Sequence, residues 1–355
     1  MSGAESFDVL VVGAGPAGCC AARQAALAGV RVLLVERRRQ IGLPVQCAEF
    51  VPWQLGQAVP IPGACVAQEI HHMRTTLPNG EVVERPSRGW VLDRALFDKH
   101  LAVLARRAGA ELRVGWRAVE WDGEEVLLRR GDREARVRAQ VVVGADGPYS
   151  TVGGWVGQRQ SEFVHAAQAE LVLPAPRACT EVYFDPAYPG GYGWLFPKGD
   201  TANVGVAVNL EMGGRPGDAL AHLLDHLKFS TADGTGRTGG AIPTGGTVAQ
   251  VRTGQVLLAG DAAGLTHPVT GGGIAPAVLS GQTAGEAAAR SVREKDPAHL
   301  DSHAREWLDV RAAPMRQALL NRHSLDGRWT ADVEALSAAV AETWIAFRAY
   351  GRPKG

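Results

Sequence analysis

The chain has 355 residues, enough for one large or two ordinary domains, and its 37 basic and 37 acidic residues leave no net charge. This balance argues against a polyanionic partner such as a nucleic acid, and mean hydropathy is only −0.06, with no apolar stretch of the ~18–20 residues that a membrane span needs. Because the predicted first strand starts near residue 7, leaving no room for a signal peptide, and five cysteines show no paired metal-ligand spacing, we expect a cytoplasmic protein.

Residues 7–36 have the pattern of a dinucleotide-binding β-α-β unit. Val9–Val12 is a short apolar run that predicts a buried parallel strand. A G-x-G-x-x-G turn, an alanine-rich helix over residues 17–28 and a second buried strand over residues 30–35 follow it. Glu36 ends that strand, where a carboxylate can accept hydrogen bonds from both hydroxyls of a ribose.

The three glycines of the turn have different roles. Gly13 allows a tight turn, Gly15 lets a pyrophosphate approach the backbone, and Gly18 lets the helix pack close to the sheet. The N-terminus of the helix offers free N–H groups and a partial positive charge. We therefore predict a dinucleotide site here, against the alternative of a glycine-rich turn in an empty doubly wound fold.

After Glu36 come three candidate functional residues, and for each of them the residue type alone allows a structural or a functional interpretation. Arg37 begins a run of three arginines, which either lie in a solvated loop or contact the adenosine ribose or phosphate. Cys47 lies in a loop punctuated by glycine and proline, where a free cysteine is usually a small buried hydrophobe. Arg94, in the first turn of the next predicted helix, either reaches a phosphate or is an ordinary surface arginine.

That helix is predicted over residues 90–109, and strands surround it. Asp93 is a plausible N-cap, and Gly109 ends the helix. Residues 64–90 read as strands, and residues 111–139, with Ala118 in the first strand, as a small antiparallel meander. Four apolar residues are expected to form the buried stripe of the helix: Leu96, Phe97, Leu101 and Leu104.

The second half of the chain predicts a separate sheet and then a return to the first. Val141–Val143 is a buried strand that delivers Asp146 at its carboxyl end. Residues 160–210 read as a mostly antiparallel sheet, residues 215–228 as a helix, and residues 230–247 as a Gly/Thr-rich connection. The aromatic residues Tyr192, Trp194 and Phe196 belong to this sheet, either in its core or in the wall of a binding tunnel.

A further strand at residues 255–261 ends in Asp261, which can hold a ribityl hydroxyl. Gly271–Gly273 then precede a long helix over residues 274–293. The free backbone N–H groups at the start of this helix suit an electron-rich ring or a phosphate as acceptor. From His299 onward, the sequence predicts two amphipathic helices that are separated near Asp326.

Four separated motifs together resemble the FAD-dependent superfamily typified by p-hydroxybenzoate hydroxylase. They are GAGPAG with Glu36, the helix that carries Arg94, VVVGADG, and LLAGDAAGLTHPVTGGGI. Within it, PVQCAE (44–49) and YGWLFPKGDTANVG (192–205) are similar to the cysteine loop and the substrate-domain motif of the geranylgeranyl reductase family. The resemblance covers about residues 7–290, and Phe50 stands where many members of the family have glycine.

The resemblance implies an α/β fold: a Rossmann-like FAD-binding domain of the glutathione reductase/p-hydroxybenzoate hydroxylase type, with an inserted antiparallel substrate sheet and C-terminal helices. We expect FAD-binding segments at 1–64, 91–155 and 250–298, substrate-binding segments at 65–90 and 156–249, and a helical segment at 299–355. The implied FAD-binding residues are Gly13, Gly15, Ala17, Gly18, Glu36, Arg37, Cys47, Ala48, Arg94, Ala118, Asp146, Asp261, Gly272, Gly273 and Ile274. Tyr192, Trp194 and Phe196 are the implied substrate residues.

The implied reaction is reduction of isolated C=C bonds in an isoprenoid chain. An isolated alkene accepts hydride from reduced flavin only if a proton reaches its other carbon, so the site must be dry and must hold an acid. Cys47 is the candidate proton source or redox neighbour. Because the chain has no second G-x-G-x-x-G, we expect NAD(P)H to dock transiently or an external carrier such as ferredoxin to supply the electrons.

Two other functions fit the same fold. One is an FAD-dependent monooxygenase acting on an apolar or aromatic substrate, and the other is a non-enzymatic prenyl-binding protein. A polyprenyl substrate would also bring the protein to the inner face of the membrane. The helices around Trp307, Leu308, Trp344, Ile345 and Phe347 either dock there or pack on the substrate domain.

Overall fold

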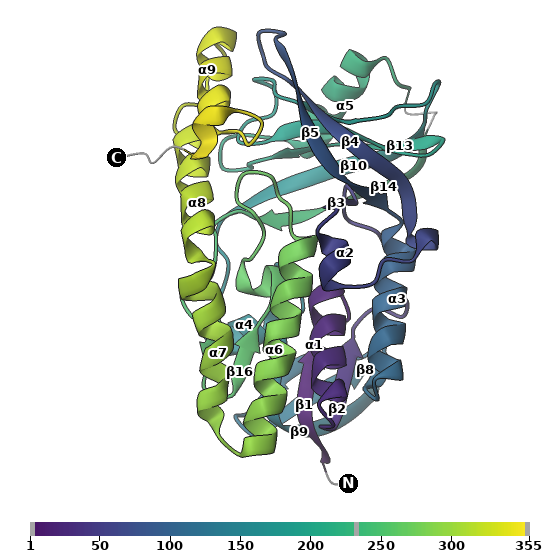
Figure 1. Ribbon diagram of the computed structural model, residues 1–355, viewed down its shortest axis with the longest axis vertical. Coiled ribbons are helices and arrows are strands. Elements are labelled where there is room, and N and C mark those ends of the chain that lie inside the picture. The colour runs from purple at the N-terminus through teal and green to yellow at the C-terminus, as the bar shows by residue number, and fades with distance from the viewer. Residues whose placement is uncertain (1–3, 231–233, 352–355) are drawn as a thin grey trace.

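Two β-sheets organise the computed structural model, which describes residues 4–230 and 234–351. Within this part of the chain each sheet has eight strands, and the first sheet lies below the second in Figure 1. The first sheet has the order β15-β16-β9-β1-β2-β6, and β7 and β8 extend it from β9. The second sheet has the order β14-β10-β13-β12-β11-β4-β5-β3.

The first sheet is built around β1 (Glu5–Val12), which pairs in parallel with β2 (Val32–Glu36) and β9 (Arg133–Gly144). In the other parallel pairs, β6 (Glu111–Val114) joins β2 and β16 (Val256–Leu258) joins β9. The short strand β15 (Arg252–Thr253) is antiparallel to β16. Helices cover one face of this sheet, so its apolar strands are buried, as their uninterrupted hydrophobic runs predicted.

The meander predicted over residues 111–139 is only partly correct. β7 (Arg117–Trp121), β8 (Glu125–Arg130) and β9 form it, whereas β6 is a parallel strand of the main sheet. β9 also runs without a break from the meander into the centre of the sheet, so Val141–Val143 is the end of a longer strand. Alternation in the first half of β9 hid this continuity, because only its second half is buried on both faces.

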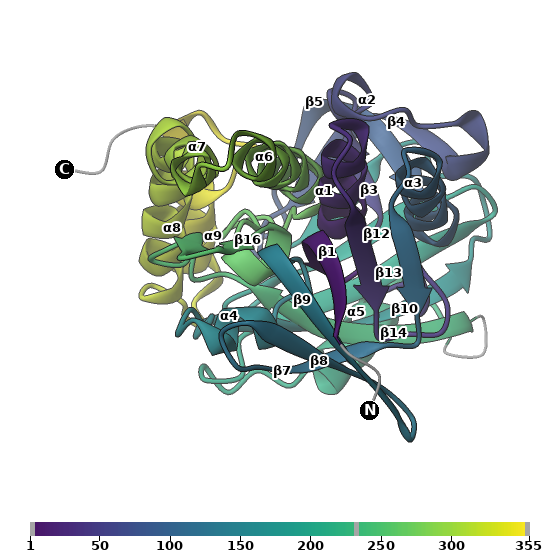
Figure 2. The ribbon, with the colours of Figure 1, turned by 90° about the horizontal axis from the view of Figure 1, so that it is seen from below.

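Three helices cover one side of the first sheet, and the β7–β8 hairpin lies on the other (Figure 2). They are α1 (Pro16–Leu27), α3 (Arg94–Arg107) and α6 (Ile274–Glu294). α1 and α6 pack closely because a Cβ at Gly281 would lie 2.1 Å from the Ala17 carbonyl oxygen. In α3 the predicted cap is confirmed, since Asp93 accepts from the Leu96 N–H at 2.9 Å. Leu96 itself is 44% exposed, which corrects the predicted stripe: the small residues Ala102 and Ala105 complete the buried face with Phe97 and Leu101.

The second sheet is antiparallel apart from the parallel pair between β11 and β4. Its strands are β3 (Phe50–Pro52), β4 (Val66–Thr76), β5 (Val82–Leu92), β10 (Phe163–Val172), β11 (Thr180–Tyr183), β12 (Tyr192–Lys198), β13 (Thr201–Val208) and β14 (Gly234–Pro243). One face of this sheet packs on α5 (Pro216–Leu227), the predicted helix, and the other faces the first sheet.

Two segments of this sheet differ from expectation. β14 occupies most of the predicted connection at residues 230–247, of which residues 231–233 lie outside the described chain. A Cβ at Gly239 would lie 2.5 Å from the Ala166 carbonyl oxygen, so the glycines that suggested a loop instead permit close strand pairing. β3 also pairs with β5, although residues 50–52 fall inside the segment expected to bind FAD.

The C-terminal helices run along both sheets (Figure 1). They are α7 (Asp301–Arg305), a π-helical turn (Glu306–Val310), α8 (Ala312–Asp326) and α9 (Val333–Thr343), so the predicted break near Asp326 is confirmed. Trp307 is buried against the first sheet and Trp344 against the second. These two indoles therefore cannot contact a membrane in this conformation, although Ile345 is exposed. No helix in the described ranges is both long and apolar enough to cross a bilayer.

His303 fixes α7 to the first sheet through a buried hydrogen-bond chain. Its Nε2 donates to the Leu258 carbonyl oxygen at 2.8 Å, so its Nδ1 accepts from the Thr283 hydroxyl, also at 2.8 Å. The Trp307 indole N–H donates to the same hydroxyl at 3.0 Å. Burial lowers the pKa of His303 to about 4, so the imidazole is neutral near pH 7.

We predict that acid destabilises the protein partly through His303. The unfolded imidazole binds a proton below pH ~6.5, whereas the folded imidazole does so only near pH 4. The stability that the neutral imidazole contributes is therefore complete above pH ~6.5 and decreases as the pH falls toward 4, by at most ~1.4 kcal/mol per pH unit. In urea unfolding at pH 7 and pH 5, His303→Gln should remove ~2 kcal/mol of this pH dependence. The exposed His323→Gln is the control, and equal pH dependence in wild type and His303→Gln would contradict the prediction.

Candidate functional site

The turn after β1 forms an uncrowded anion cradle. Gly13 has φ +99°, and a Cβ there would lie 2.3 Å from the Ala145 carbonyl oxygen, so only glycine fits. Gly15 precedes α1, whose first turn has no side-chain cap, and a Cβ at Gly15 would meet no atom within 4 Å. Free N–H groups beside open space at a helix N-terminus suit the pyrophosphate of a dinucleotide. At Gly18 a Cβ would lie 1.7 Å from the Gly13 carbonyl oxygen.

The acid at the end of β2 is fixed by the backbone around it. Glu36 accepts from the Ala14 N–H at 2.9 Å and from the Arg38 N–H at 2.8 Å. Arg37 beside it is exposed, and Ala118 is buried in β7. A carboxylate held in this way beside a helix N-terminus fits the adenosine half of FAD.

Asp146 has a local role that sequence reasoning missed. One carboxylate oxygen accepts from the Ser150 hydroxyl at 2.5 Å, and the other from the N–H groups of Thr151 and Val152 at 2.7 and 3.2 Å. These bonds hold the first turn of α4 (Thr151–Trp155). Burial raises the pKa of Asp146, and the hydrogen bonds oppose that shift.

A second uncapped helix N-terminus lies beside Asp261. Gly273 precedes α6, and a Cβ there would lie 3.1 Å from Asp261 Oδ1. That oxygen also accepts from the Thr266 hydroxyl at 2.8 Å. Gly272 is exposed, whereas Ile274 is buried at the start of the helix. The arrangement offers backbone donors and one acceptor to a polar ring or a polyol.

Arg94 joins this region to the cysteine loop. Its guanidinium forms two bonds of 2.9 Å with the Asp98 carboxylate, one turn along α3, and both side chains are largely buried. The same guanidinium contacts the Cys47 thiol, and its charge also lowers the pKa of Asp261 against the effect of burial. Arg94 therefore lies close to the Cys47 thiol, and its charge acts on Asp261. Asp98 was not predicted, although an acid four residues after an arginine in a helix was a usable signal.

The cysteine loop is fixed through its backbone. The Glu49 N–H donates to Cys47 Sγ at 3.2 Å, and the Gln168 side chain donates to the Cys47 carbonyl oxygen at 3.1 Å. Asn203 donates to the Ala48 carbonyl oxygen at 3.4 Å. Burial raises the pKa of the Cys47 thiol, and Arg94 and the Glu49 N–H oppose this shift. Gln168 and Asn203 were missed, because a single amide in an apolar strand carries no local signal.

The three aromatic residues of β12 share one face because they alternate along the strand, and this face is opposite the one that packs on α5. Trp194 is 5% exposed and its indole N–H donates to the Gln168 side chain at 3.0 Å. Tyr192 and Phe196 are half-buried. The Tyr192 ring lies 6.0 Å from that of Trp194, and the Phe196 ring lies 6.1 Å from that of Phe50. Ala48 packs on the same cluster, so the cysteine loop and the aromatic face are in contact.

The glycine turn before α6 is held by two tyrosines from other elements. The Tyr192 hydroxyl donates to the Thr270 carbonyl oxygen at 2.5 Å, and the Tyr350 hydroxyl lies 2.9 Å from His267 Nε2. His267 Nδ1 accepts from the Thr270 N–H at 3.2 Å, so its Nε2 carries the proton and donates to Tyr350. Burial lowers the pKa of His267 to about 4. His267 and Tyr350 were both missed by sequence reasoning, since they meet only in the folded chain.

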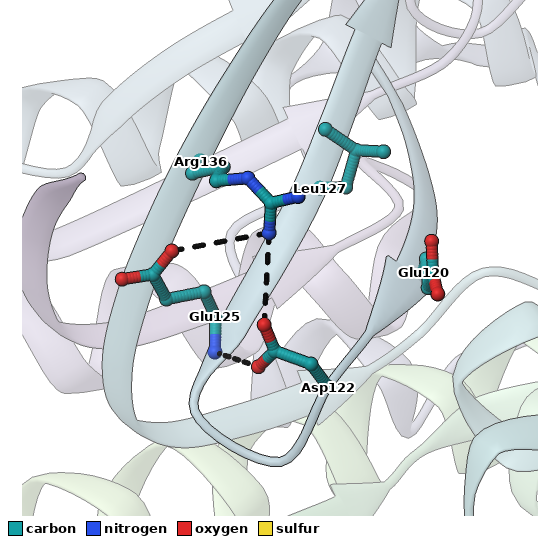
Figure 3. A pocket seen from close by; sticks show the side chains of 5 residues that line it. All are labelled: Glu120, Asp122, Glu125, Leu127 and Arg136. Atoms are coloured by element: carbon teal, nitrogen blue, oxygen red, sulfur yellow. Dashed lines mark hydrogen bonds and ion pairs between the residues drawn. The ribbon is translucent and has the colours of Figure 1, made fainter. Parts of the chain in front are cut away.

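A surface hollow on the β7–β9 meander contains none of the predicted residues (Figure 3). Arg136 Nη1 lies 3.6 Å from Asp122 and 4.0 Å from Glu125, so its charge is already balanced. Glu120 and Leu127 complete the lining. We assign no function to this hollow.

Comparisons with known proteins agree with this geometry. A model described as FAD dependent oxidoreductase matches residues 8–45, and one described as geranylgeranyl reductase catalytic domain matches residues 168–238. The chain is 37% identical to a digeranylgeranylglycerophospholipid reductase of Methanosarcina acetivorans, over 82% of this chain and 77% of the relative. It is 39% identical to a second such reductase of Methanopyrus kandleri, over 82% of this chain and 78% of the relative.

Solved structures show the same fold. A geranylgeranyl bacteriochlorophyll reductase-like protein of Thermoplasma acidophilum matches with a TM-score of 0.77 and 27% identity, over 96% of this chain and 97% of that one. A probable FAD-dependent monooxygenase of Pseudomonas aeruginosa matches with a TM-score of 0.70 and 21% identity, over 94% and 99%, which shows the fold alone. The predicted α/β fold class, with a second sheet and C-terminal helices, is confirmed.

We predict that Asp98→Asn destabilises the protein and loosens the site. An amide can accept from only one of the two guanidinium N–H groups, which leaves the largely buried Arg94 charge without its partner. Urea unfolding should show a loss of ~3 kcal/mol, and FAD fluorescence quenching should show weaker binding. Glu294→Gln removes the exposed i,i+4 pair with Arg290 and an exposed contact with His299, and it should cost far less. Losses of similar size in the two variants would contradict the prediction.

Proposed function

The chain belongs to the geranylgeranyl reductase family of FAD-dependent oxidoreductases, and on this premise we propose that it reduces isolated C=C bonds of an isoprenoid chain. The resemblance carried by the sequence motifs is thereby confirmed at the level of the family. The observation that most supports the proposal is the contact of the Cys47 loop with both Arg94, through Glu49, and the aromatic face of β12. It puts a thiol between a candidate flavin site and an apolar surface.

We propose that FAD extends from the turn after β1 to the turn before α6. Gly13, Gly15, Ala17 and Gly18 would hold the pyrophosphate, and the adenosine would lie beside Glu36, Arg37, Ala118 and Asp146. Cys47, Ala48, Arg94, Asp261, Gly272, Gly273 and Ile274 would surround the ribityl chain and the ring. The open space at Gly15 and the uncapped start of α6 support this path, and residues 1–64, 91–155 and 250–298 would form the FAD-binding domain. Bound FAD, once reduced, supplies the hydride for one alkene carbon.

The side chains of the site have complementary tasks in this proposal. Half-buried Tyr192 and Phe196 would hold the alkene against the ring and exclude water, with buried Trp194 supporting them from the sheet. Because burial raises its pKa, the Cys47 thiol stays protonated near pH 7 and can supply a proton to the second carbon. The thiolate left behind would be stabilised by the Arg94 guanidinium and the Glu49 N–H.

The proposal also includes a source of electrons for the flavin and a contact with the membrane surface. We infer that NAD(P)H docks transiently or that a carrier such as ferredoxin reduces the flavin, because the chain carries one dinucleotide motif. A polyprenyl substrate partitions into bilayers, so the protein would meet the inner face of the membrane. Ile345, which is 42% exposed and follows α9, is an apolar side chain that remains free for this contact.

The test is direct detection of the reduced product. Purified protein containing FAD should be reduced under anaerobic conditions and mixed with a geranylgeranyl compound, in detergent or in liposomes. Mass spectrometry should show a gain of about 2 Da for each double bond reduced. Parallel reactions with dithionite, NADPH, NADH and reduced ferredoxin identify the donor, and oxidised protein is the control. An unchanged mass under anaerobic conditions, with a gain of about 16 Da in air, would instead favour a monooxygenase.

We predict that Cys47→Ala slows this reaction while leaving FAD bound. Loss of a positioned acid typically lowers kcat by ~10²–10⁴-fold, and the adenosine cradle does not depend on the thiol. Steady-state kinetics and the flavin spectrum measure the two effects. Cys179→Ala, which removes the other half-buried cysteine, should leave kcat unchanged. If Cys47→Ala turned over like wild type, Cys47 would not be the proton source.

A further inference from the structure

A buried carboxylate, that of Glu49, connects the cysteine loop to three other elements. One oxygen accepts from the backbone N–H of Arg94 at 2.7 Å, at the start of α3. The other accepts from Lys198 Nζ at 2.7 Å and from Asn203 Nδ2 at 2.8 Å, at the end of β12 and on β13. Glu49 is only 1% exposed, and neither the proposed hydride transfer nor the proposed FAD contacts use its side chain.

The backbone at Glu49 is held in a conformation that its residue type disfavours. Its φ is +72°, a left-handed value that is uncommon for residues with a Cβ and that persists only where surrounding contacts impose it. This turn aims the Glu49 N–H at Cys47 Sγ, 3.2 Å away. The hydrogen bonds of the Glu49 side chain and the position of the Cys47 thiol therefore both depend on the conformation of Glu49.

The ion pair also ties Cys47 to the face proposed to contact the alkene. Lys198 lies on the same side of β12 as Tyr192, Trp194 and Phe196, because the four alternate along the strand. The Lys198 side chain is 15% exposed and its ammonium is paired with Glu49, so this pair is electrically neutral and presents no free charge to an anionic ligand. A buried ion pair is seldom a net source of stability, but its directional bonds can fix how two elements meet.

We propose that Glu49 is a positioning residue that fixes the Cys47 thiol against the substrate sheet through its bonds to Lys198 and Asn203. The inference rests on the proposed role of Cys47 as the proton source. Because a thiol displaced by about 1 Å cannot deliver its proton to the alkene carbon efficiently, loss of the pair should lower kcat by ~10²-fold with little change in KM.

Four variants separate positioning from folding. Glu49→Gln presents an amide nitrogen to at least one of its former donors, and Lys198→Met leaves the carboxylate unpaired. Glu49→Gln combined with Lys198→Met contains no unpaired buried charge, so it tests positioning even if either single variant fails to fold. Lys198→Arg keeps the ion pair and should restore function. Glu134→Gln, which removes an exposed ion pair with Arg129, is the control.

The readout that needs no turnover is alkylation of each cysteine, followed in the FAD-loaded protein by peptide mass spectrometry. A loosened loop should speed labelling of Cys47 alone, while Cys19, Cys20 and Cys65 stay slow because they are buried in the core. Lys198→Arg and Glu134→Gln should label like wild type. In the reductase assay, the same loop-loosening variants should show the fall in kcat.

Two results would overturn the proposal. In the first, the double variant labels Cys47 at the wild-type rate, which would mean that Glu49 does not hold the loop. In the second, the core cysteines Cys19, Cys20 and Cys65 label faster together with Cys47, which would mean that Glu49 acts only on global stability. If wild type reduces no alkene, the proposed function fails, but the labelling experiment still decides whether Glu49 positions the thiol.

Discussion

A largely buried guanidinium, that of Arg94, is the constraint on which the rest of the site depends. A charge in this position must be paired, and Asp98 supplies the pair with two bonds of 2.9 Å from the same helix. With its charge balanced by Asp98, Arg94 can lie beside the cysteine loop without leaving an uncompensated charge in the core. Its backbone N–H donates to Glu49 of that loop, and its charge acts on both Cys47 and Asp261, which come from distant parts of the chain.

Two other polar side chains of the site are also paired. Gln168 donates to the Cys47 carbonyl oxygen and accepts from the Trp194 indole, so one amide fixes both the loop and the aromatic face. His267, whose pKa burial lowers to about 4, remains neutral and bonds the backbone of the glycine turn. These contacts satisfy the hydrogen-bonding groups of the backbone without water, and a site for hydride transfer needs water to be excluded.

The sequence predicted those elements whose signals are local. The glycine spacing after β1 and the aspartate before α3 act within a few residues, and the acid at the end of β2 acts within one β-α-β unit; the structure has the corresponding turn, cap and carboxylate. Predictions failed where the decisive contact was distant. β14 reads as a loop because its glycines carry no periodicity, yet they allow it to approach β10. For Trp307 and Trp344 the sequence left membrane docking and packing on the substrate domain both open, and the structure shows each indole buried against a sheet.

The sequence by itself therefore determined the nucleotide fold and the family, because glycine spacing and motif order are written along the chain, and it proposed candidate site residues. Only the tertiary structure decided what holds these residues in place. Glu49 and Lys198 are separated by 149 residues, and Asn79 and Ser337 by 258. Such partners are chosen by how the two sheets and the C-terminal helices pack, and packing depends on burial and shape over the whole molecule, which no local pattern encodes.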